Sequence, residues 1–388
     1  MSGDEKPKSK KRRLFSLLFW FVIVVALALV ALSLIPGRTP GRSLLSEMLF
    51  SRAPTISVSE FNFEVGRDRV FAHANGSIAA VGTMGLQVLG PDGQETLRSS
   101  YRAVSPAITV KDDFFLAYDI GGTSARVFNS SDVLSHVETE GLIVSASINK
   151  NGWFCVVTQE RGGFRGTVYV YNNDGAQVYI VNIGSGFVLS AQLSADNKNL
   201  AILSMAEKGS QITYYNGIDS YKDEPDNIYE FGNIVVLDIS FIANTKILAV
   251  STQALHLVDF SGGSANHQNL FDGKRLAGYS YNEKFIAVHL YDYSIGYSGR
   301  TRTFALDGTL ISESESSLEF ISMASTVNAL MILRSSGLFF YNRQLEEFPA
   351  SETSASVSTA SRVLALNDDM ALVANDHFAI VIRRGEED

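Results

Sequence analysis

Two different hydrophobic patterns divide the chain near residue 55. The first is an unbroken apolar run of 22 residues, Leu14 to Ile35, in which only Ser16 and Ser33 are polar and no residue is charged. A helix of roughly 20 apolar residues is long enough to cross a bilayer, whereas a helix on a soluble core would keep a polar face. The pattern therefore predicts a transmembrane helix over residues 14–35.

The residues on either side of this run predict that it is not removed as a signal peptide, and they predict its orientation in the membrane. Cleavable signal peptides have an apolar region of roughly 7–15 residues and a small-residue cleavage site, but this run is longer and ends in Pro36-Gly37, which favours a signal-anchor. Residues 1–13 contain six Lys or Arg, and only Arg38 and Arg42 follow closely after the run. The positive-inside rule then predicts a cytoplasmic tail over 1–13, a linker over 36–55 and an extracytoplasmic C-terminal part at the cell membrane.

After residue 55 the pattern changes to short apolar runs separated by Asn-Gly and Asp-Gly pairs, a strong signal of β-hairpins. The runs come in pairs, a wholly apolar one and then a more aromatic one. The aromatic runs start 36 to 47 residues apart, at Leu86, Arg126, Val168, Ile212, Leu255, Arg302, Leu338 and Phe378. A period of about 40 to 45 residues with four short strands per unit is typical of β-propeller blades.

The ends of the repeat predict how the ring closes. The eighth unit ends at Arg383-Arg384-Gly385 with no room for a fourth strand, and residues 56–63 form a strand-like segment before the first unit. Pairing the two would remove the open sheet edges. We therefore predict an all-β fold with an eight-bladed propeller over residues 56–388, with seven blades as the alternative. A small residue recurs in each apolar run, and we expect that run to form an inner strand in the crowded region near the central axis.

Over residues 56–388 the periodicity resembles the propeller superfamily that includes WD40 and quinoprotein-like repeats. The Trp-Asp dipeptide of WD40 blades is missing, and Trp153 is the only tryptophan outside residues 14–35. With its basic tail, anchor and degenerate repeats, the whole chain resembles an uncharacterised family of membrane-anchored propeller proteins from clostridial Gram-positive bacteria. The resemblance implies a compartment, and it implies no catalytic residues.

Charge and cysteine content narrow the possible functions. The chain has a net charge of −9 although its first 13 residues are basic, so the remainder is strongly acidic. An acidic domain repels phosphate backbones, which argues against a nucleic-acid partner. The single cysteine, Cys155, lies in an apolar run and is predicted to be a small core residue, so no internal disulfide holds the domain together.

No motif in the sequence supports catalysis, a cofactor or a metal. The chain has no Gly-x-Ser-x-Gly elbow and no phosphate-binding loop, and Gly184-Ser185-Gly186 lacks the βαβ context of a dinucleotide site. The six histidines are scattered along the repeat without ligand spacing. The acidic stretch at Asp219, Asp223, Glu224 and Asp226 could hold Ca²⁺, but it lacks the calcium-loop pattern and fits a solvated loop better.

The most suggestive surface is the face formed by loops that join the second strand of a blade to the third. Three of these loops are enlarged, at residues 160–165, 206–210 and 291–300. Exposed aromatic rings with a few cations suit sugar stacking or a protein interface. The predicted ligand- or partner-binding residues are Arg161, Phe164, Arg165, Tyr291, Tyr293 and Tyr297.

These observations favour a non-enzymatic binding or scaffold protein, anchored in the bilayer through residues 14–35, with an envelope protein or a glycan as partner. The alternative is a cell-envelope enzyme that acts on glycan, with acidic residues gathered on the propeller axis, because propellers also host enzymes. A tail of 13 residues leaves no room for a signalling domain inside the cell.

Overall fold

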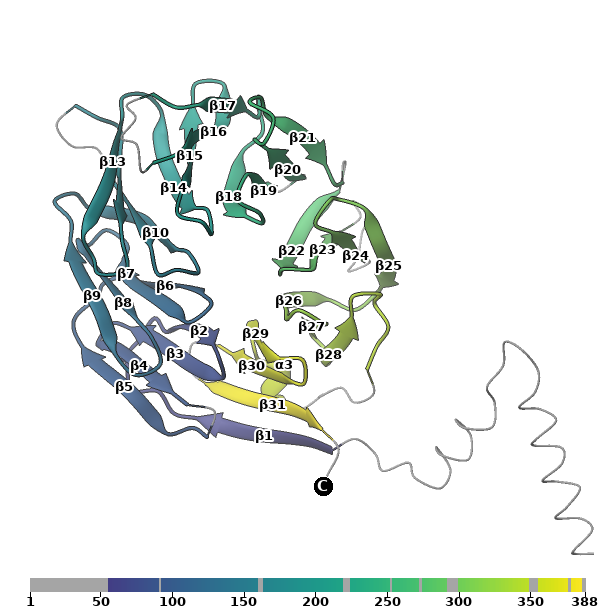
Figure 1. Ribbon diagram of the computed structural model, residues 1–388. Helices are drawn as coiled ribbons and strands as arrows, with labels where there is room; N and C mark the ends of the chain where they lie inside the picture. Colours follow the sequence, from purple (N-terminus) through teal and green to yellow (C-terminus); the bar gives the residue numbers. More distant parts are fainter. Residues whose placement is uncertain are drawn as a thin grey trace, which may run out of the picture. The chain divides into compact units, whose positions relative to one another are not determined.

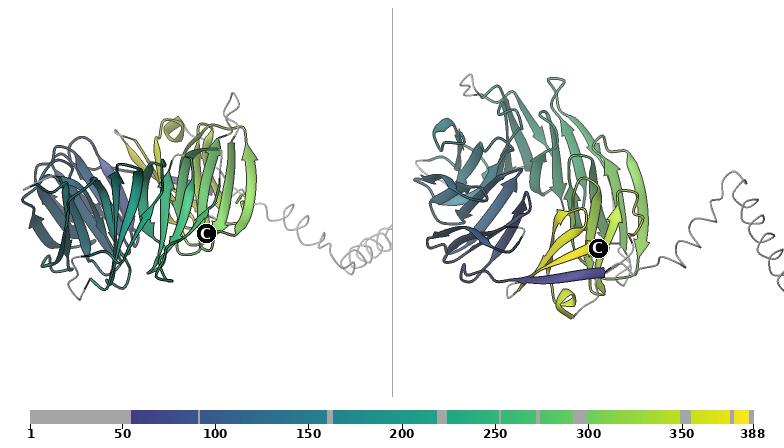
Figure 2. Two further views of the ribbon diagram at one scale, coloured as in Figure 1. Left: turned by 90° about the horizontal axis from the view of Figure 1, so that it is seen from above. Right: turned by 60° about the horizontal axis from the view of Figure 1, so that its bottom comes forward.

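The computed structural model describes residues 55–385 except for 91, 160–162, 219–223, 252, 272–273, 292–298, 349–354 and 376–377. Residues Ile56–Gly385 form one compact unit in which eight antiparallel sheets surround a common axis (Figure 1). Seen from the edge, the sheets form a single disk (Figure 2). The fold is therefore an all-β propeller of eight blades, and the alternative of seven is wrong.

In the first four blades the strands follow one another from the axis outward. Blade 1 contains β2 (Val70–Ala74), β3 (Ser77–Gly82), β4 (Gly85–Leu89) and β5 (Glu95–Ser100); blade 2 contains β6 (Pro106–Lys111), β7 (Phe114–Asp119), β8 (Ser124–Phe128) and β9 (Val133–Glu138); blade 3 contains β10 (Ile143–Ile148), β11 (Phe154–Thr158), β12 (Gly166–Tyr171) and β13 (Gln177–Ile183); blade 4 contains β14 (Phe187–Leu193), β15 (Asn199–Ala206), β16 (Gly209–Asn216) and β17 (Asn227–Glu230).

Blades 5 and 6 repeat this order, and blade 7 departs from it. Blade 5 contains β18 (Val236–Phe241), β19 (Lys246–Ser251), β20 (Leu255–Asp259) and β21 (Asn266–Asn269); blade 6 contains β22 (Arg275–Tyr281), β23 (Phe285–Tyr291), β24 (Gly299–Ala305) and β25 (Leu310–Ser316); blade 7 contains only β26 (Phe320–Ser325), β27 (Ala329–Arg334) and β28 (Gly337–Asn342) in the described residues. A single bridge between Tyr341 and Glu347 stands where its fourth strand would begin, and the helix α3 (Ala355–Ser358) follows. In the described residues, this blade therefore has three of the four strands that the repeat predicts.

The eighth blade joins the two ends of the domain. Its sheet has the order β1-β31-β30-β29, made of β29 (Arg362–Asn367), β30 (Met370–Ala374), β31 (Ala379–Gly385) and β1 (Thr55–Phe61). The strand from the start of the domain thus supplies the outer strand that the last unit lacks (Figure 1). The predicted closure is confirmed.

The wholly apolar run of each unit forms the second strand from the axis, with only one strand of its sheet lying closer to the axis. In β3, β7, β11, β15, β19, β23, β27 and β30 the central side chains are 0–4% exposed. A second strand has a neighbouring blade on each of its two faces, so both sets of alternating side chains are buried. The small residues in it fit this sandwiched position.

Eight apolar clusters form the core, and each lies between two adjacent blades. In β11, for example, Cys155 and Val157 pack against blade 4, whereas Phe154 and Val156 pack against blade 2. Cys155 is a free, fully buried thiol whose pKa is raised by burial, as its predicted role as a core residue requires. The blades are therefore held together face to face.

Hairpin turns add polar links around the ring. Asn75 and Gly76 both have positive φ, 45° and 80°, which matches the tight hairpin turn that the Asn-Gly pair predicts. Residues in or next to the turns between first and second strands also bond to the next blade: Asn149 Nδ2 donates to Ser194 O at 2.8 Å, and Asn199 Nδ2, at the start of β15, donates to Asn244 O at 3.0 Å. Equivalent bonds join blades 6 and 7 and blades 7 and 8.

The predicted tail, transmembrane helix and most of the linker, residues 1–54, lie outside the described residues. Within the described residues, no helix has both the length and the apolar character needed to span a bilayer.

Closure can be tested at Phe63, which follows β1. Its side chain is 4% exposed and packs with Phe71 of blade 1 in the cluster that also contains Leu372 of blade 8. We expect Phe63→Ala to lower the free energy of unfolding by about 3–5 kcal/mol, as measured by chemical denaturation. The exposed residue Ser59 provides the control, because Ser59→Ala should change stability by less than about 0.5 kcal/mol. Equal effects of the two variants would contradict closure through this segment.

Buried histidines predict a loss of stability in acid. Burial lowers the pKa of His256 and of His289 to about 4, with smaller contributions from His267 and Arg334 respectively. Because the unfolded chain takes up these protons near pH 6.5, stability is complete above that pH and falls as the pH drops toward 4, by up to about 3 kcal/mol per histidine. We expect denaturation curves between pH 7 and 4.5 to show this loss. In His256→Gln and His289→Gln the slope should be smaller, and an unchanged slope would contradict the assignment.

Candidate functional site

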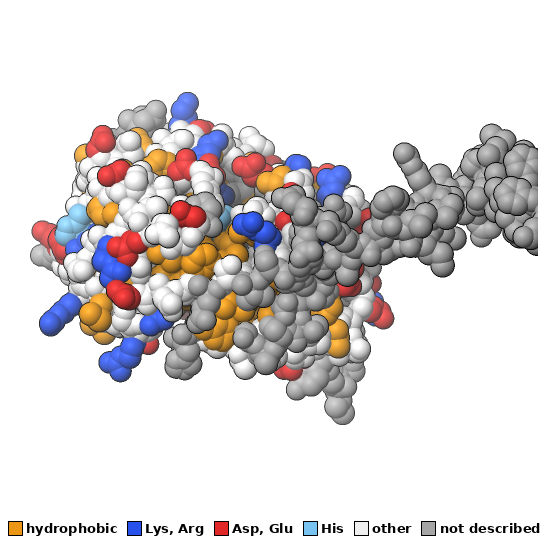
Figure 3. Space-filling model, turned by 90° about the horizontal axis from the view of Figure 1, so that it is seen from below, with side chains coloured by type: hydrophobic (Ala, Val, Ile, Leu, Met, Phe, Trp, Pro, Cys, Tyr) orange, Lys and Arg blue, Asp and Glu red, His pale blue; other side chains and the backbone are white. Residues whose placement is uncertain are grey.

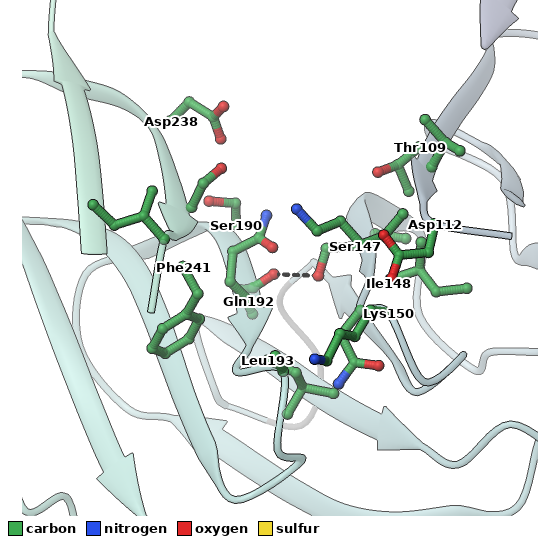
Figure 4. Close-up of a pocket in the computed structure, with 18 of the residues that line it drawn as sticks. Thr109, Asp112, Ser147, Ile148, Lys150, Ser190, Gln192, Leu193, Asp238 and Phe241 are labelled. Atoms are coloured by element: carbon green, nitrogen blue, oxygen red, sulfur yellow. Dashed lines mark hydrogen bonds between the residues drawn. The ribbon is translucent and has the colours of Figure 1, made fainter. Parts of the chain in front are cut away.

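A cavity of about 590 Å³ lies at the centre of the ring. Its walls are the innermost strands of blades 2 to 6 and the turns that follow them, as Figure 4 shows for part of the lining. Cavities of this size are large enough for a small organic ligand. No sequence motif pointed to this site, because its residues come from five separate units.

A repeated β-bulge shapes the wall. In blades 3 to 7 the pairing of the innermost strand shifts by one residue near its start, so that one residue has no partner. The residues that follow the shift are Ser145, Ser190, Asp238, Gly278 and Ser322. A bulge redirects the side chains after it. Three of these residues, Ser145, Ser190 and Asp238, line the cavity.

Asp238 is the only acidic residue on the eight innermost strands. Its side chain is half-buried, Tyr279 donates its hydroxyl to Oδ2 at 2.9 Å, and the backbone N–H of Ile239 donates to Oδ1 at 2.9 Å. Burial raises the pKa of Asp238, while these two hydrogen bonds oppose the shift. Among the described residues, Asp238 forms no salt bridge with a Lys, Arg or His side chain.

Three half-buried tyrosines lie near this carboxylate. Tyr118 and Tyr281 line the cavity, and Tyr279 bonds Asp238. Burial and the Asp238 charge raise the pKa of Tyr279, and burial is also the main cause of the raised pKa of Tyr118 and Tyr281. The Lys111 Nζ lies 5.9 Å from the centre of the Tyr281 ring. Lys111 belongs to blade 2 and Tyr281 to blade 6, so this contact reaches across the axis.

Hydroxyl and amide groups complete the lining. The Ser147 Oγ donates to Ala191 O at 2.6 Å, the bond drawn in Figure 4. The Oγ atoms of Ser145 and Ser190 are buried and have no hydrogen-bond partner within the protein. Buried polar atoms without partners are unusual and costly, so a rotation about χ1 that turned these hydroxyls toward a ligand or water in the cavity would be favourable.

The arrangement offers binding groups rather than a recognisable catalytic set. Besides Asp238, the acidic lining residues are Asp112 and Glu283, which lie in the turns after β6 and β22. Asp238 is instead near the start of β18. About three strand residues, or roughly 10 Å along the propeller axis, therefore separate Asp238 from Asp112 and Glu283. No group of three or more His, Cys, Asp or Glu suited to a metal ion occurs among the residues that the structure describes.

The predicted binding residues have different surroundings. Phe164 is 42% exposed, and Arg165 lies 5.8 Å from the ring centre of Phe187, so these residues form an exposed group on blades 3 and 4. Tyr291 is half-buried, with its hydroxyl 3.4 Å from Phe320 O and its ring edge against His289. Arg161, Tyr293 and Tyr297 lie outside the described residues, as do Asp219 and Asp223 of the acidic stretch.

Exposed apolar side chains gather on the face that the sequence favoured. This face contains the turns from second to third strands and the connections from each outer strand to the next innermost strand. Of the fifteen large apolar side chains that are exposed in the described residues, nine lie in these turns and connections or in the first two residues of the innermost strand that follows: Met84, Val104, Ile120, Leu142, Phe164, Phe187, Val235, Leu237 and Leu318. We call these nine residues the apolar face. Figure 3 shows one side of the rim, where an apolar area lies among charges of both signs.

Comparisons with known proteins support the fold. The family model described as "Family of unknown function (DUF5711)" matches residues 56–362. No curated protein matches the chain by sequence. Similar solved structures include Sqt1 from Saccharomyces cerevisiae, with a TM-score of 0.58, 10% identity and coverage of 86% of this chain and 98% of that one. The C-terminal WD40 domain of Sif2 is also similar, with a TM-score of 0.59, 14% identity and coverage of 84% of this chain and 99% of that one.

A third similar structure is BamB from Moraxella catarrhalis, with a TM-score of 0.50, 13% identity and coverage of 84% of this chain and 98% of that one. At such low identity these likenesses establish the propeller fold alone. The propeller fold is also what the periodicity of the sequence predicted.

Proposed function

Because this chain belongs to the DUF5711 family, to which no function is assigned, we propose its role from the geometry: it is a non-enzymatic binding module that holds a protein partner on the apolar face. The observation that carries the proposal is the concentration of exposed apolar side chains on that one face. Exposed apolar residues scattered singly need no explanation, but a gathering of them on one surface is typical of interaction sites.

The chemistry of the apolar face favours a protein over a glycan. Its exposed side chains are mostly aliphatic, with Met84, Val104 and Leu237 each more than half exposed. Sugar rings stack on flat aromatic side chains and need hydrogen-bonding groups beside them, whereas aliphatic groups gain most from an apolar protein surface. Phe164 and Phe187, with Arg165 against the second ring, are the best candidates for anchor residues.

The ring is suited to this role because it holds the face rigid. Eight clusters of buried side chains join every blade to both neighbours, and β1 closes the last sheet. Loops on such a scaffold lose little conformational entropy when a partner binds.

An envelope enzyme acting on glycan is the weaker alternative. Hydrolysis of a glycosidic bond ordinarily uses two carboxylates roughly 5–9.5 Å apart on either side of the bond. Among the described lining residues, Asp238 is the acidic residue near the start of an innermost strand. The two other acidic residues, Asp112 and Glu283, lie in the turns at the opposite end of the innermost strands. One carboxylate among hydroxyl groups fits binding better than this chemistry.

The proposed location is the outer side of the cell membrane, with residues 14–35 as the anchor. The 22-residue apolar run and the six basic residues before it support this location. Outer strands run toward the apolar face, since their ends lead into the next innermost strand, so β1 begins on the opposite face.

The location predicts the outcome of reporter fusions. A reporter that works only outside the cytoplasm should be active when fused after Asp388, because the charge bias places residues 1–13 inside. The matching fusion before Met1 should be inactive. Activity of a cytoplasm-only reporter after Asp388 would contradict the proposed orientation.

The apolar face predicts which substitutions abolish partner binding. We expect Phe187→Ser with Leu237→Ser to reduce recovery of partners cross-linked to the full-length chain in intact membranes by about tenfold or more, because losing anchor residues typically costs about 2 kcal/mol or more. Recovery is measured by quantitative mass spectrometry.

The matched control is Val178→Ser with Ile228→Ser, two residues that are also exposed but lie on outer strands. This control should recover the same partners as the unmodified chain, and both double variants should retain their unfolding midpoint. If the outer-strand variant loses the partners and the Phe187 and Leu237 variant keeps them, the binding surface is the rim.

A further inference from the structure

We propose that the central cavity binds the positively charged ammonium or guanidinium group of an organic ligand, with Asp238 as its counter-ion. This site is separate from the apolar face and does not depend on the function proposed for that face. Four observations in the structure support it: an unpaired carboxylate, a ring of tyrosines, buried acceptors without partners and a lysine that reaches across the axis.

The carboxylate provides the charge. Asp238 is half-buried and, in the described part of the chain, has two hydrogen-bond donors but no cationic partner. Taking an ionised carboxylate out of water without a cation is unfavourable, and an incoming cation would remove that penalty. The equivalent positions in blades 3, 4 and 7 carry Ser145, Ser190 and Ser322. Blade 5 therefore differs from the repeat by one charged residue at the cavity wall.

The tyrosines provide an apolar wall that favours cations. Tyr118 and Tyr281 line the cavity on different blades, and Tyr279 holds Asp238 through its hydroxyl. The face of an aromatic ring attracts a cation within about 6 Å of its centre. Tyr281 already has such a neighbour, because Lys111 Nζ lies 5.9 Å from its ring centre. The cavity thus accommodates an ammonium group against this ring.

The unpartnered hydroxyls provide the remaining acceptors. Ammonium and guanidinium groups have three and five N–H donors and no acceptor, so a site for them must be rich in acceptors. Ser145 and Ser190 line the cavity at the same position in their blades as Asp238, and their Oγ atoms, which are buried and have no partner in the protein, would accept from a ligand after rotation about χ1. A neutral ligand would satisfy these hydroxyls as well, but it would leave the carboxylate unpaired.

Lys111 gives the proposal a second, independent consequence. Its ammonium group extends from blade 2 to the Tyr281 ring of blade 6 and so occupies part of the space that a cationic ligand would use. Its positive charge also repels a second cation. Replacing Lys111 with an uncharged side chain of similar length should therefore strengthen binding, which is the opposite of the effect expected for a residue that only stabilises the fold.

The test is calorimetric titration of the full-length chain in a neutral detergent with cadaverine and with agmatine, which carry ammonium and guanidinium groups. 1,5-Pentanediol is the uncharged match for cadaverine. N-acetyl-lysine amide and N-acetyl-arginine amide distinguish a free amine from a protein side chain as the source of the cation. We expect the unmodified chain to bind at least one cation of the series and not the diol.

Three variants connect the binding to the site. Asp238→Asn should weaken cation binding by about tenfold or more, because it removes the charge of a desolvated pair. Asp112→Asn changes an exposed acidic residue of the same cavity and should alter affinity less than about twofold, as expected for a screened charge. Lys111→Met should bind the same cation more tightly than the unmodified chain.

Three results would each contradict the proposal. It fails if no cation of the series binds, if the diol binds as well as cadaverine, or if Asp238→Asn binds as tightly as the unmodified chain. Unfolding curves check that Asp238→Asn is folded. If it is not, Asp238→Ser replaces it, because serine already occupies this position in three other blades.

Discussion

The packing of each second strand between two neighbouring blades is the interaction on which the rest of the structure depends. Such a strand is apolar on both faces, and Phe154, Cys155, Val156 and Val157 of β11 are all 0–1% exposed. A sheet of this kind cannot stand at the end of a row, since one apolar face would meet water. Every blade therefore needs a neighbour on both sides, and a closed ring is the arrangement that supplies them.

Ring closure explains why the two ends of the domain share a blade. Blade 8 receives β1 from one end and β29 to β31 from the other, and the cluster around Phe63, Phe71 and Leu372 joins it to blade 1. A strand exchanged in this way covers a sheet edge and links distant parts of the sequence. Blade 7 has three strands in the described residues, and its second strand, β27, is as fully buried as those of the other blades.

The same geometry separates two kinds of surface. At the axis, the innermost strands carry hydroxyl groups, Lys111 and Asp238, because only one side of each strand is covered by the rest of its sheet. On the apolar face, the connections between strands expose Met84, Val104, Phe187 and others without a repeat of the same residue. Loops can vary in this way because blade packing places little restraint on them. A cavity for a small charged group and a broad face for a protein can therefore exist on one rigid ring.

The sequence by itself determined the elements and their number. Alternation, Asn-Gly turns and a spacing of about 40 residues are local signals, so they predicted the blades and the missing eighth outer strand that residues 56–63 supply. The burial of Cys155 followed from its apolar neighbours in the same way. The sequence also singled out the face that carries Phe164 and Arg165, through the length of its loops.

The tertiary structure alone decided which residues meet at the axis. Asp238, Tyr281 and Lys111 lie in three separate units, and no local pattern relates them. They come together because the ring brings blades 2, 5 and 6 around one cavity, and a closed ring creates contacts between residues far apart in the chain.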